Sequence, residues 1–393
     1  MRQTVKPDVL QDILVNILAL DKGFKEYEFY HCFLGGKDIL KKASSIKFGD
    51  AYLFLKNALA GLDKLDIPDN FPYYRKTYVK DLLACVLAQA DKFVYKRKMP
   101  FVKLEEALTG SKILPPFNTA RDFAAADKKV KALIGAGIKE FRQWQGPRVN
   151  GFKEVKKCSQ NIIDEKLQAA LQYSQLFKQF DLKEIINKMR IRIVNYAPNG
   201  SPCFFKYEGN YRGTMGLVDT KDVKKSFLNG FAMHEGVPGH FLYYCIKQYL
   251  ADHGRGDAAT LIDTFYSPEN CLNEGLAVCS HLIFDKLVTP YAHAVNEAEK
   301  MLHKIFYNLW HAANIKPADT KLELQLLENF NMSGGPGPLI KYFAKDEKFY
   351  TPYYPYGIYY AESIIPKIKK ENLGFLYQQH SINTLKKLVK EQK

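Results

Sequence analysis

One segment of this chain has the residue types and spacing of a hydrolytic metal site. It reads H-E-G-V-P-G-H and runs from His234 to His240, with Glu235 directly after the first histidine. Hydrolytic zinc binds three protein ligands, commonly two histidines and a glutamate, and keeps a fourth position open for water. A carboxylate beside the metal takes the proton from that water. His234 and His240 are therefore candidate zinc ligands, and Glu235 is the candidate general base.

The six-residue spacing of the two histidines requires a break in the helix that carries them. Ligand histidines on a regular helix are four residues apart and lie on one face. At about 100° per residue, a separation of six places the imidazoles on different sides. Pro238 removes a backbone donor and clashes with the preceding turn, so we expect a kink or bulge that returns His240 to the face of His234. The alternative is that both are ordinary surface or core histidines and that Pro238 only ends a helix.

A third ligand is available in Glu274, 40 residues after His234. Ser267 followed by Pro268 is typical of a helix start, so Glu274 is expected early in a capped helix. A helix, a loop and a second helix would let Glu274 face His234 and complete a site for one zinc ion per chain. Alternatively, a glutamate near a helix N-terminus only interacts favourably with the helix dipole.

The elements that position these residues are predicted to be mostly helices. Apolar residues recur at helical spacing in five segments of the first half: 8–20, 49–62, 75–95, 120–144 and 159–190. From residue 191 the pattern changes, and three short strands are predicted at 191–196, 203–207 and 215–218. Further helices are predicted at 222–250, 268–287 and 291–314, followed by a glycine- and proline-rich loop at 333–338. We therefore expect a helical N-terminal lobe, 1–190, and a zinc-binding lobe with a small sheet, 191–393, or one continuous domain.

Composition and charge describe an ordinary globular protein. Of 393 residues, 47% are apolar and 25% are charged, and no apolar run approaches the length of a membrane span. No signal peptide is recognised, and seven dispersed cysteines without a CxxC pair indicate free thiols, so a cytoplasmic location is expected. The net charge of +15 is spread along the chain, which favours a solvated basic surface over nucleic-acid binding. Neither a membrane nor a nucleic-acid partner is expected, and the oligomeric state is not predicted.

The two motifs together resemble a known group. H-E-G-V-P-G-H, followed at this interval by E-G-L-A at Glu274, is similar to the H-E-x-x-P-G-H-H and E-G-W-A-L-Y motifs of a large bacterial family of unknown function. That family is distantly related to carboxypeptidase Taq and the thimet-oligopeptidase-like zincins. The resemblance covers about residues 205–365. It implies a large helical zincin-like fold with a deep cleft and a small antiparallel sheet before the zinc-binding helix.

The resemblance also implies roles for individual residues. His234, His240 and Glu274 would be the zinc ligands, Glu235 the general base, and His311 a polar group near the substrate. Arg212 lies in a segment that precedes the zinc helix in relatives, and it is a candidate to bind a substrate carboxylate. Candidate donors to the oxyanion of the tetrahedral intermediate are Tyr356, Tyr359 and Tyr360. His281 follows Glu274 by seven residues and either supports it from the same helical face or is simply packed.

The departures from the family pattern leave the function open between three hypotheses. This chain has Phe241 where relatives have a further histidine, and Leu276, Cys279 and His281 where they have tryptophan, tyrosine and an acidic residue. The first hypothesis is a zinc-dependent carboxypeptidase or oligopeptidase that cleaves peptide or small amide substrates, some of them acidic. The second is a tailoring amidohydrolase that acts on one small metabolite or peptide. The third is a catalytically inactive binding protein with a basic surface, which retention of Glu235 and Glu274 disfavours.

Overall fold

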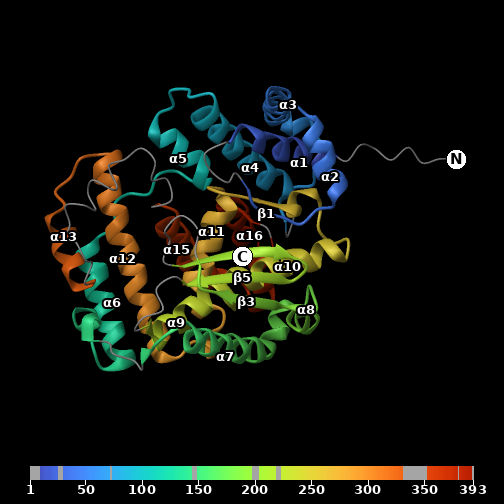
Figure 1. Ribbon diagram of the computed structural model, residues 1–393. Coiled ribbons are helices and arrows are strands. Elements are labelled where there is room, and N and C mark those ends of the chain that lie inside the picture. The colour runs from blue at the N-terminus through green and yellow to red at the C-terminus, as the bar shows by residue number, and fades with distance from the viewer. Residues whose placement is uncertain are drawn as a thin grey trace.

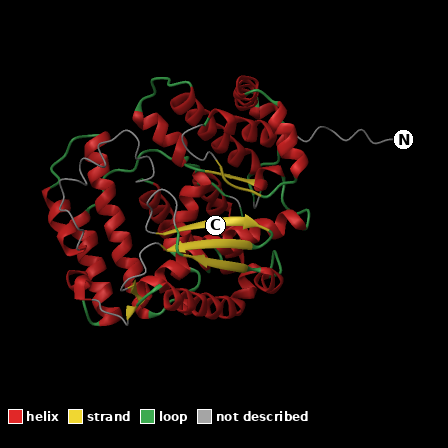
Figure 2. Ribbon diagram, in the orientation of Figure 1, coloured by secondary structure: helices red, strands yellow, loops and turns green. Residues whose placement is uncertain are grey.

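The computed structural model describes residues 9–24, 30–70, 73–143, 148–196, 203–217, 223–330, 352–378 and 380–391. These residues fold mostly into helices, with a few short strands in small sheets (Figures 1 and 2). The expected mostly helical fold, with a small sheet before the helix of His240, is confirmed. The predicted loop at 333–338 lies outside the described residues.

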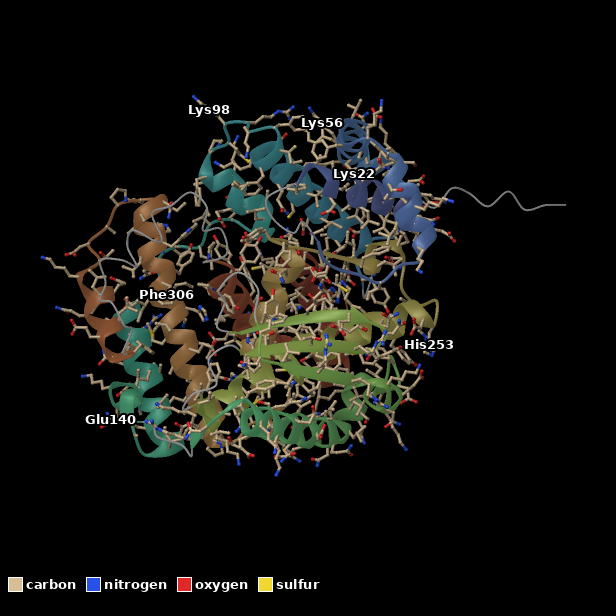
Figure 3. All side chains as sticks on the ribbon, viewed as in Figure 1. Lys22, Lys56, Lys98, Glu140, His253 and Phe306 are labelled. Atoms are coloured by element: carbon tan, nitrogen blue, oxygen red, sulfur yellow. The ribbon has the colours of Figure 1, made fainter. Side chains whose placement is uncertain are left out.

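Four helices at the N-terminal side form a bundle with its own apolar core. They are α1 (Val9–Leu20), α2 (Lys37–Ser45), α3 (Phe48–Ala60) and α4 (Arg75–Gln89), which continues as a π-helical turn over Ala90–Val94. Three of them confirm the helices predicted at 8–20, 49–62 and 75–95. The carbonyls at the end of α2 are satisfied by Lys22, which donates to Ala43 O and Ile46 O at 3.2 and 2.8 Å. A cation there also balances the negative end of the helix dipole. Figure 3 labels Lys22 among the N-terminal helices.

The next four helices deviate from the predicted boundaries for local reasons. They are α5 (Phe101–Thr109), α6 (Thr119–Ile134), α7 (Phe152–Ala170) and α8 (Leu182–Lys188). The helix predicted at 120–144 is too long, because Gly135 takes a left-handed conformation with φ of 75° and ends α6. The helix predicted at 159–190 is interrupted between α7 and α8. The second piece begins where the Asp181 side chain accepts a hydrogen bond from the backbone N–H of Glu184.

A three-stranded sheet lies between α7 and the helices of the site. Its strands are β3 (Arg190–Val194), β4 (Cys203–Gly209) and β5 (Arg212–Leu217), in the order β3-β5-β4. β3 runs parallel to β5 and β4 runs antiparallel to it, so the sheet is mixed where an antiparallel sheet was expected. On its inner face, the rings of Phe205 and Tyr207 pack against Phe241 and Tyr244. Two further strand pairs are β1 (Tyr30–Phe33) with β7 (Ile262–Thr264), and β2 (Arg148–Val149) with β6 (Val223–Lys224).

The C-terminal helices surround the candidate site. They are α9 (Lys225–Phe231), α10 (His240–Asp252), α11 (Pro268–Val278), α12 (Pro290–Asn314), α13 (Lys321–Leu327), α15 (Tyr353–Ile364) and α16 (Ile382–Glu391). Figure 1 shows α6, α12 and α13 together on one side of the molecule and α10 beside the sheet. α12 confirms the helix predicted at 291–314. The helix predicted at 268–287 is too long, because α11 ends at Val278.

Two glycines let α11 and α15 pack with their backbones in contact. A Cβ at Gly275 would lie 2.0 Å from the carbonyl carbon of Gly357, and a Cβ at Gly357 would lie 2.1 Å from Cys271 O. Any side chain at either position therefore forces the helices apart. Around this contact, one apolar core cluster takes residues from both chain halves, from Cys32 to Leu388. The division into lobes at residue 190 stays a prediction.

Glu105 on α5 is a buried carboxyl group with no hydrogen-bond partner in the described part of the chain. Burial holds its pKa well above the ordinary value, because an ionised carboxylate would be poorly solvated there. The ionisable side chains that interact with it are Cys271, Tyr307, Tyr353 and Tyr356. Burial is the main cause that raises the pKa of each of these groups, so none of them brings a charge close to Glu105 at neutral pH.

A buried ion pair links α10 to α11 close to the candidate site. Lys247 Nζ lies 2.9 Å from Glu269 Oε1, and both side chains are almost inaccessible to water. Tyr78 donates to the other oxygen of Glu269 at 2.5 Å, and Tyr243 donates to Oε1. Such a pair fixes how two helices are oriented, because either charge left alone in the core would be costly.

Candidate metal centre

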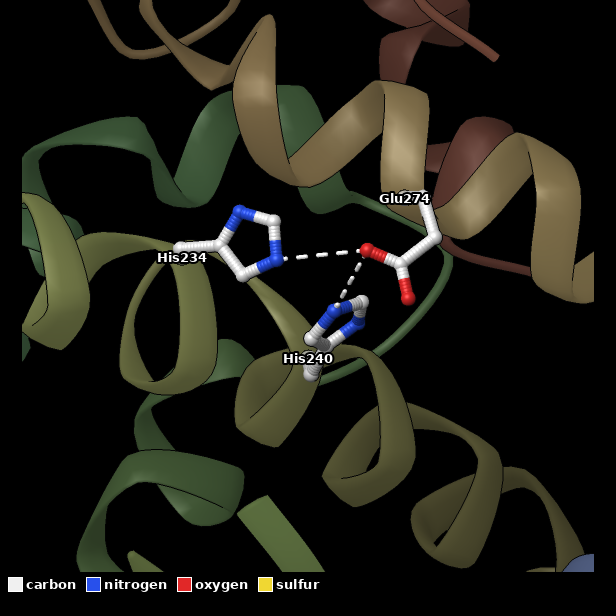
Figure 4. A group of neighbouring side chains, drawn as sticks. All are labelled: His234, His240 and Glu274. Carbon is white, nitrogen blue, oxygen red and sulfur yellow. Dashed lines mark ion pairs between the residues drawn. The ribbon is translucent and has the colours of Figure 1, made fainter. Parts of the chain in front are cut away.

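The structure brings His234, His240 and Glu274 together in one group (Figure 4). Oε2 of Glu274 lies 3.2 Å from His234 Nε2 and 3.3 Å from His240 Nε2. The two imidazole rings are nearly perpendicular, with centroids 4.8 Å apart. Zinc bonds of about 2.0–2.1 Å at tetrahedral angles place neighbouring ligand atoms about 3.3 Å apart. The two distances from Glu274 to the histidines match this separation, and all three donor atoms lie within 4.8 Å of one another.

A break in the helix produces this arrangement. The backbone widens into a π-helical turn over Ala232–Gly236, becomes extended at Val237, and starts α10 at His240. The Val237–Pro238 peptide bond is cis. The expected interruption at Pro238 is confirmed, and it is a full break between two helices rather than a bulge within one. His240 is therefore placed by the N-terminus of a new helix and not by the periodicity of the first.

Gly239 makes this break possible. A Cβ at position 239 would lie 1.8 Å from His234 O and 2.5 Å from Met233 O. The N–H of Gly239 donates to Met233 O at 2.9 Å, so the chain after the π-helical turn folds directly onto that turn. Only glycine fits between the two histidines at this close approach.

Glu274 is positioned by a capped and fully buried helix. The Ser267 side chain accepts a hydrogen bond from Asn270 N at 3.0 Å, and Pro268 occupies the first helical turn, as expected from the sequence. Every residue of α11 is buried, and Gly275 holds the helix against α15. The carboxylate of Glu274 is thus held on a rigid element with little freedom to move away from the histidines.

The electrostatics of the group favour a cation. Burial opposes ionisation of Glu274, but the imidazoles of His240 and His234 outweigh it and hold the pKa of Glu274 well below its ordinary value. Burial likewise opposes a charge on His234, but Glu274 and Glu235 raise the pKa of His234 to about 9. A field that stabilises a proton on buried imidazoles also stabilises a metal ion, which competes for the same lone pairs. The donor set and its surroundings fit zinc.

Glu235 lies next to this group and is deeply set. Burial is the strongest influence on its carboxyl group and raises its pKa above the ordinary value, against the opposing effect of His234 and His240. A carboxylate with a raised pKa is a better base toward water than an exposed one. The role of Glu235 as the general base stays a prediction.

Three residues at the centre were not identified from the sequence. Tyr354 stacks on His234 with ring centroids 6.0 Å apart, and His303 stacks on Tyr354 at 4.4 Å with parallel rings. Nε2 of His303 lies 3.8 Å from Glu299 Oε1, and the charge of Glu299 acts on both His234 and Glu235. Glu299 and His303 are four residues apart on α12, a spacing that puts them on one helical face and was visible in the sequence.

The three tyrosines expected as oxyanion donors lie elsewhere on α15. Tyr356 is buried and accepts a hydrogen bond from Leu114 N at 3.0 Å. The hydroxyl of Tyr360 lies 2.6 Å from Ser111 Oγ, and Tyr359 is 43% exposed. None of their contacts within the described residues reaches the histidines. Residues two positions apart on a helix point to nearly opposite sides. Because Tyr354 of α15 faces His234, Tyr356 points away from it.

Three other candidate residues also lie apart from the group. His311 is eight residues beyond His303 on α12, a rise of about 12 Å, and its ring contacts that of Tyr307 with centroids 6.0 Å apart. Arg212 is exposed at the start of β5, opposite Arg190 of β3. His281 does not share a helical face with Glu274, because α11 ends three residues before it. Their expected roles in catalysis or substrate binding have no support from their positions.

Comparison with known proteins identifies a solved structure with a similar fold and gives no information about the chemistry of the site. No protein-family model matches the sequence. No curated protein matches it either. The fold is similar to the crystal structure described as the putative lipoprotein from Colwellia psychrerythraea, with a TM-score of 0.53. The match covers 87% of this chain and 69% of that chain at 11% sequence identity, which indicates a shared fold. Among the described helices, none is long and apolar enough to cross a bilayer.

Proposed function

We propose that this protein is a zinc-dependent hydrolase of peptide or amide bonds. The observation that carries the proposal is the group of His234, His240 and Glu274, in which both histidines lie at a tetrahedral-edge distance from the Glu274 carboxylate and the half-buried Glu235 follows His234 in the chain. Three ligands with a neighbouring carboxylate are the arrangement of catalytic zinc sites, whereas purely structural zinc sites are closed by four protein ligands.

The residues of the centre divide the chemistry between them. Bound zinc supplies Lewis acidity toward the scissile carbonyl and lowers the pKa of water toward about 7. Glu235 accepts the proton of the attacking water and delivers it to the leaving amine. Tyr354 stacks on His234, and His303 stacks on the other side chain of that contact, Tyr354. We propose Tyr354 and His303 as donors to the developing oxyanion in place of Tyr356, Tyr359 and Tyr360.

The positions of the departures from the family pattern favour a peptidase-type hydrolase over a tailoring enzyme. Phe241 is buried against Phe205 in the sheet, and Leu276 and Cys279 are buried in the core. These three substitutions therefore change packing rather than a surface that a substrate would touch. A peptide or small amide remains the proposed substrate. The dispersed cysteines, free where the structure describes them, support a reducing location such as the cytoplasm.

The test combines metal analysis with one conservative variant. Protein purified without chelators is analysed for zinc, and wild type and Glu235→Gln are assayed on a panel of short peptides. We expect Glu235→Gln to retain zinc and to lose about 100- to 10,000-fold in kcat, the usual contribution of a general base. His253→Ala serves as a control, because His253 lies at the edge of the molecule beside Glu184 (Figure 3).

Three outcomes decide between the hypotheses. Broad peptide cleavage that depends on Glu235 supports the peptidase. Bound zinc without cleavage of any peptide in the panel favours the tailoring amidohydrolase. No zinc at the group of His234, even after zinc is offered, refutes the hydrolase and favours the binding protein.

A further inference from the structure

A second group of two histidines and a glutamate lies away from the first. His281 is in the short turn Ser280–Leu282 after α11, and His293 and Glu297 are in the first turns of α12. Oε1 of Glu297 lies 3.3 Å from His293 Nε2 and 3.6 Å from His281 Nε2. The imidazole centroids are 4.4 Å apart. The donor types and separations are close to those of the first group.

His281 has a buried ring whose two nitrogens make no hydrogen bond within the described residues. It is 5% exposed, so water does not readily satisfy these atoms. An unsatisfied polar group in the core costs about 1–3 kcal/mol. A neutral imidazole has one N–H donor and one nitrogen lone pair, and without a hydrogen-bond partner this lone pair stays available. A neutral imidazole with an unused lone pair, directed at a carboxylate and a second imidazole, is the form that binds a metal ion.

The carboxylate of Glu297 forms ion pairs with two lysine side chains. Lys129 of α6 lies 2.6 Å from Glu297 Oε1, and Lys300 lies 2.7 Å from the same atom. Lys300 has a second partner, Glu362 at 2.7 Å, whereas Lys129 is 45% exposed and can turn into water. A divalent ion that replaces Lys129 at Glu297 exchanges one cation for another without uncovering a buried charge.

We propose that His281, His293 and Glu297 form a second site for a divalent metal of the zinc class, which competes with Lys129 for Glu297. Two imidazoles and one carboxylate are a ligand set that suits zinc better than calcium or magnesium, which prefer oxygen ligands. The site joins the end of α11 to the start of α12. The metal therefore fastens the helix of Glu274 to the helix of Glu299 and His303. Metal binding at the second site does not require catalysis at the first centre.

The test is a titration of the metal-free protein with Zn²⁺ alone, followed by calorimetry. Wild type should bind two zinc ions, His240→Ala one, His293→Ala one, and the double variant none. His253→Ala, which removes a histidine from another His–Glu pair, should bind two. If His293→Ala binds as many ions as wild type, or His240→Ala binds none, the second site is refuted. If His240→Ala and wild type bind the same single ion, the first centre and the proposed hydrolase fail while the second site stands.

A lysine variant tests the competition without removing a ligand. Lys129→Met should tighten zinc binding at the second site about 5- to 10-fold in the His240→Ala background, because the ammonium no longer holds Glu297. Lys131→Met is the matched control: Lys131 lies on the same helix, is 55% exposed, and pairs with Asp127 at 3.1 Å. Equal affinities in the Lys129→Met and Lys131→Met proteins would overturn the proposed competition, and thermal unfolding of each variant verifies its fold.

Discussion

Replacing Gly239 with alanine should separate His240 from the other two candidate ligands. The added Cβ would lie 1.8 Å from His234 O and 2.5 Å from Met233 O, and both obstacles are backbone atoms of a buried turn. Neither can turn aside as a flexible side chain would. The backbone between the two histidines therefore has to open, and the start of α10 has to move with it.

The displacement can be estimated from the same distances. Real Cβ contacts below 3.0 Å are essentially never found, so the clash with His234 O has to widen by at least 1.2 Å, the difference between 3.0 and 1.8 Å. Metal sites tolerate ligand distances within about 0.2 Å of the ideal value, so the shift is about six times the tolerance. We expect zinc affinity to fall at least about 100-fold. The strain should also lower the free energy of unfolding by about 1–3 kcal/mol.

The assay measures zinc affinity and unfolding in parallel, with Gly230→Ala as the matched control. Gly230 lies in α9, and a Cβ there would meet only a Val295 methyl group at 4.0 Å. Gly230→Ala should therefore bind zinc normally and be more stable by about 0.5–1 kcal/mol, because alanine is the better helix residue. Wild-type zinc affinity in a folded Gly239→Ala protein would refute the reasoning that close backbone packing positions His240.

Three further predictions concern Glu105, the ion pair of Lys247 with Glu269, and Tyr354. In the wild type, the contribution of Glu105 to stability is complete below the pKa of about 4.5 in the unfolded chain. This contribution should be lost at about 1.4 kcal/mol per pH unit as the pH rises toward the raised pKa of the folded state. The free energy of unfolding of Glu105→Gln, measured in urea, should therefore depend less on pH than that of the wild type. Identical pH profiles of the two proteins would contradict this. Lys247→Met should lower the free energy of unfolding by about 3–5 kcal/mol, because the buried Glu269 loses its ion-pair partner. The double variant Lys247→Met with Glu269→Leu should recover most of this stability. A double variant as unstable as Lys247→Met would argue against the proposed role of the ion pair. Tyr354→Phe should lower kcat about 100-fold at unchanged zinc content, whereas Tyr360→Phe, whose hydroxyl meets Ser111, should not; the opposite order would return the oxyanion role to Tyr360.

Much of the helical architecture follows from local sequence. Apolar spacing located α1, α3, α4 and α12 to within a few residues, because each of these helices buries one stripe or most of its surface. Helix starts such as Ser267 with Pro268 were also legible, since a cap acts through hydrogen bonds to the next turn. Helix ends were harder to predict from the sequence. The ends at Gly135 and after Val278 were missed, because periodic apolar residues continue past both points.

The identity of the candidate ligands was likewise visible in the sequence, because it depends on residue types. His234, Glu235 and His240 stand in one short motif, and Glu274 follows a recognisable helix cap. Pro238 correctly indicated that the helix does not pass through the motif unchanged. The role of Gly239 was not visible, because it depends on how closely the chain after the π-helical turn folds back onto Met233 and His234.

The surroundings of the centre were decided only by tertiary structure. Sequence favoured Tyr356, Tyr359 and Tyr360 over Tyr354, although all four lie on α15, because nothing in a run of tyrosines shows which face of the helix meets the site. That choice is made by the contact of Gly275 with Gly357, which sets the rotation of α15 against α11. His281 faces Glu297 rather than Glu274 for a similar reason, since α11 stops short of it. Residue types and local spacing thus determine which groups can bind a metal, whereas helix packing determines what lies around it, because the rotation of one helix against another is set by contacts between residues far apart in the chain.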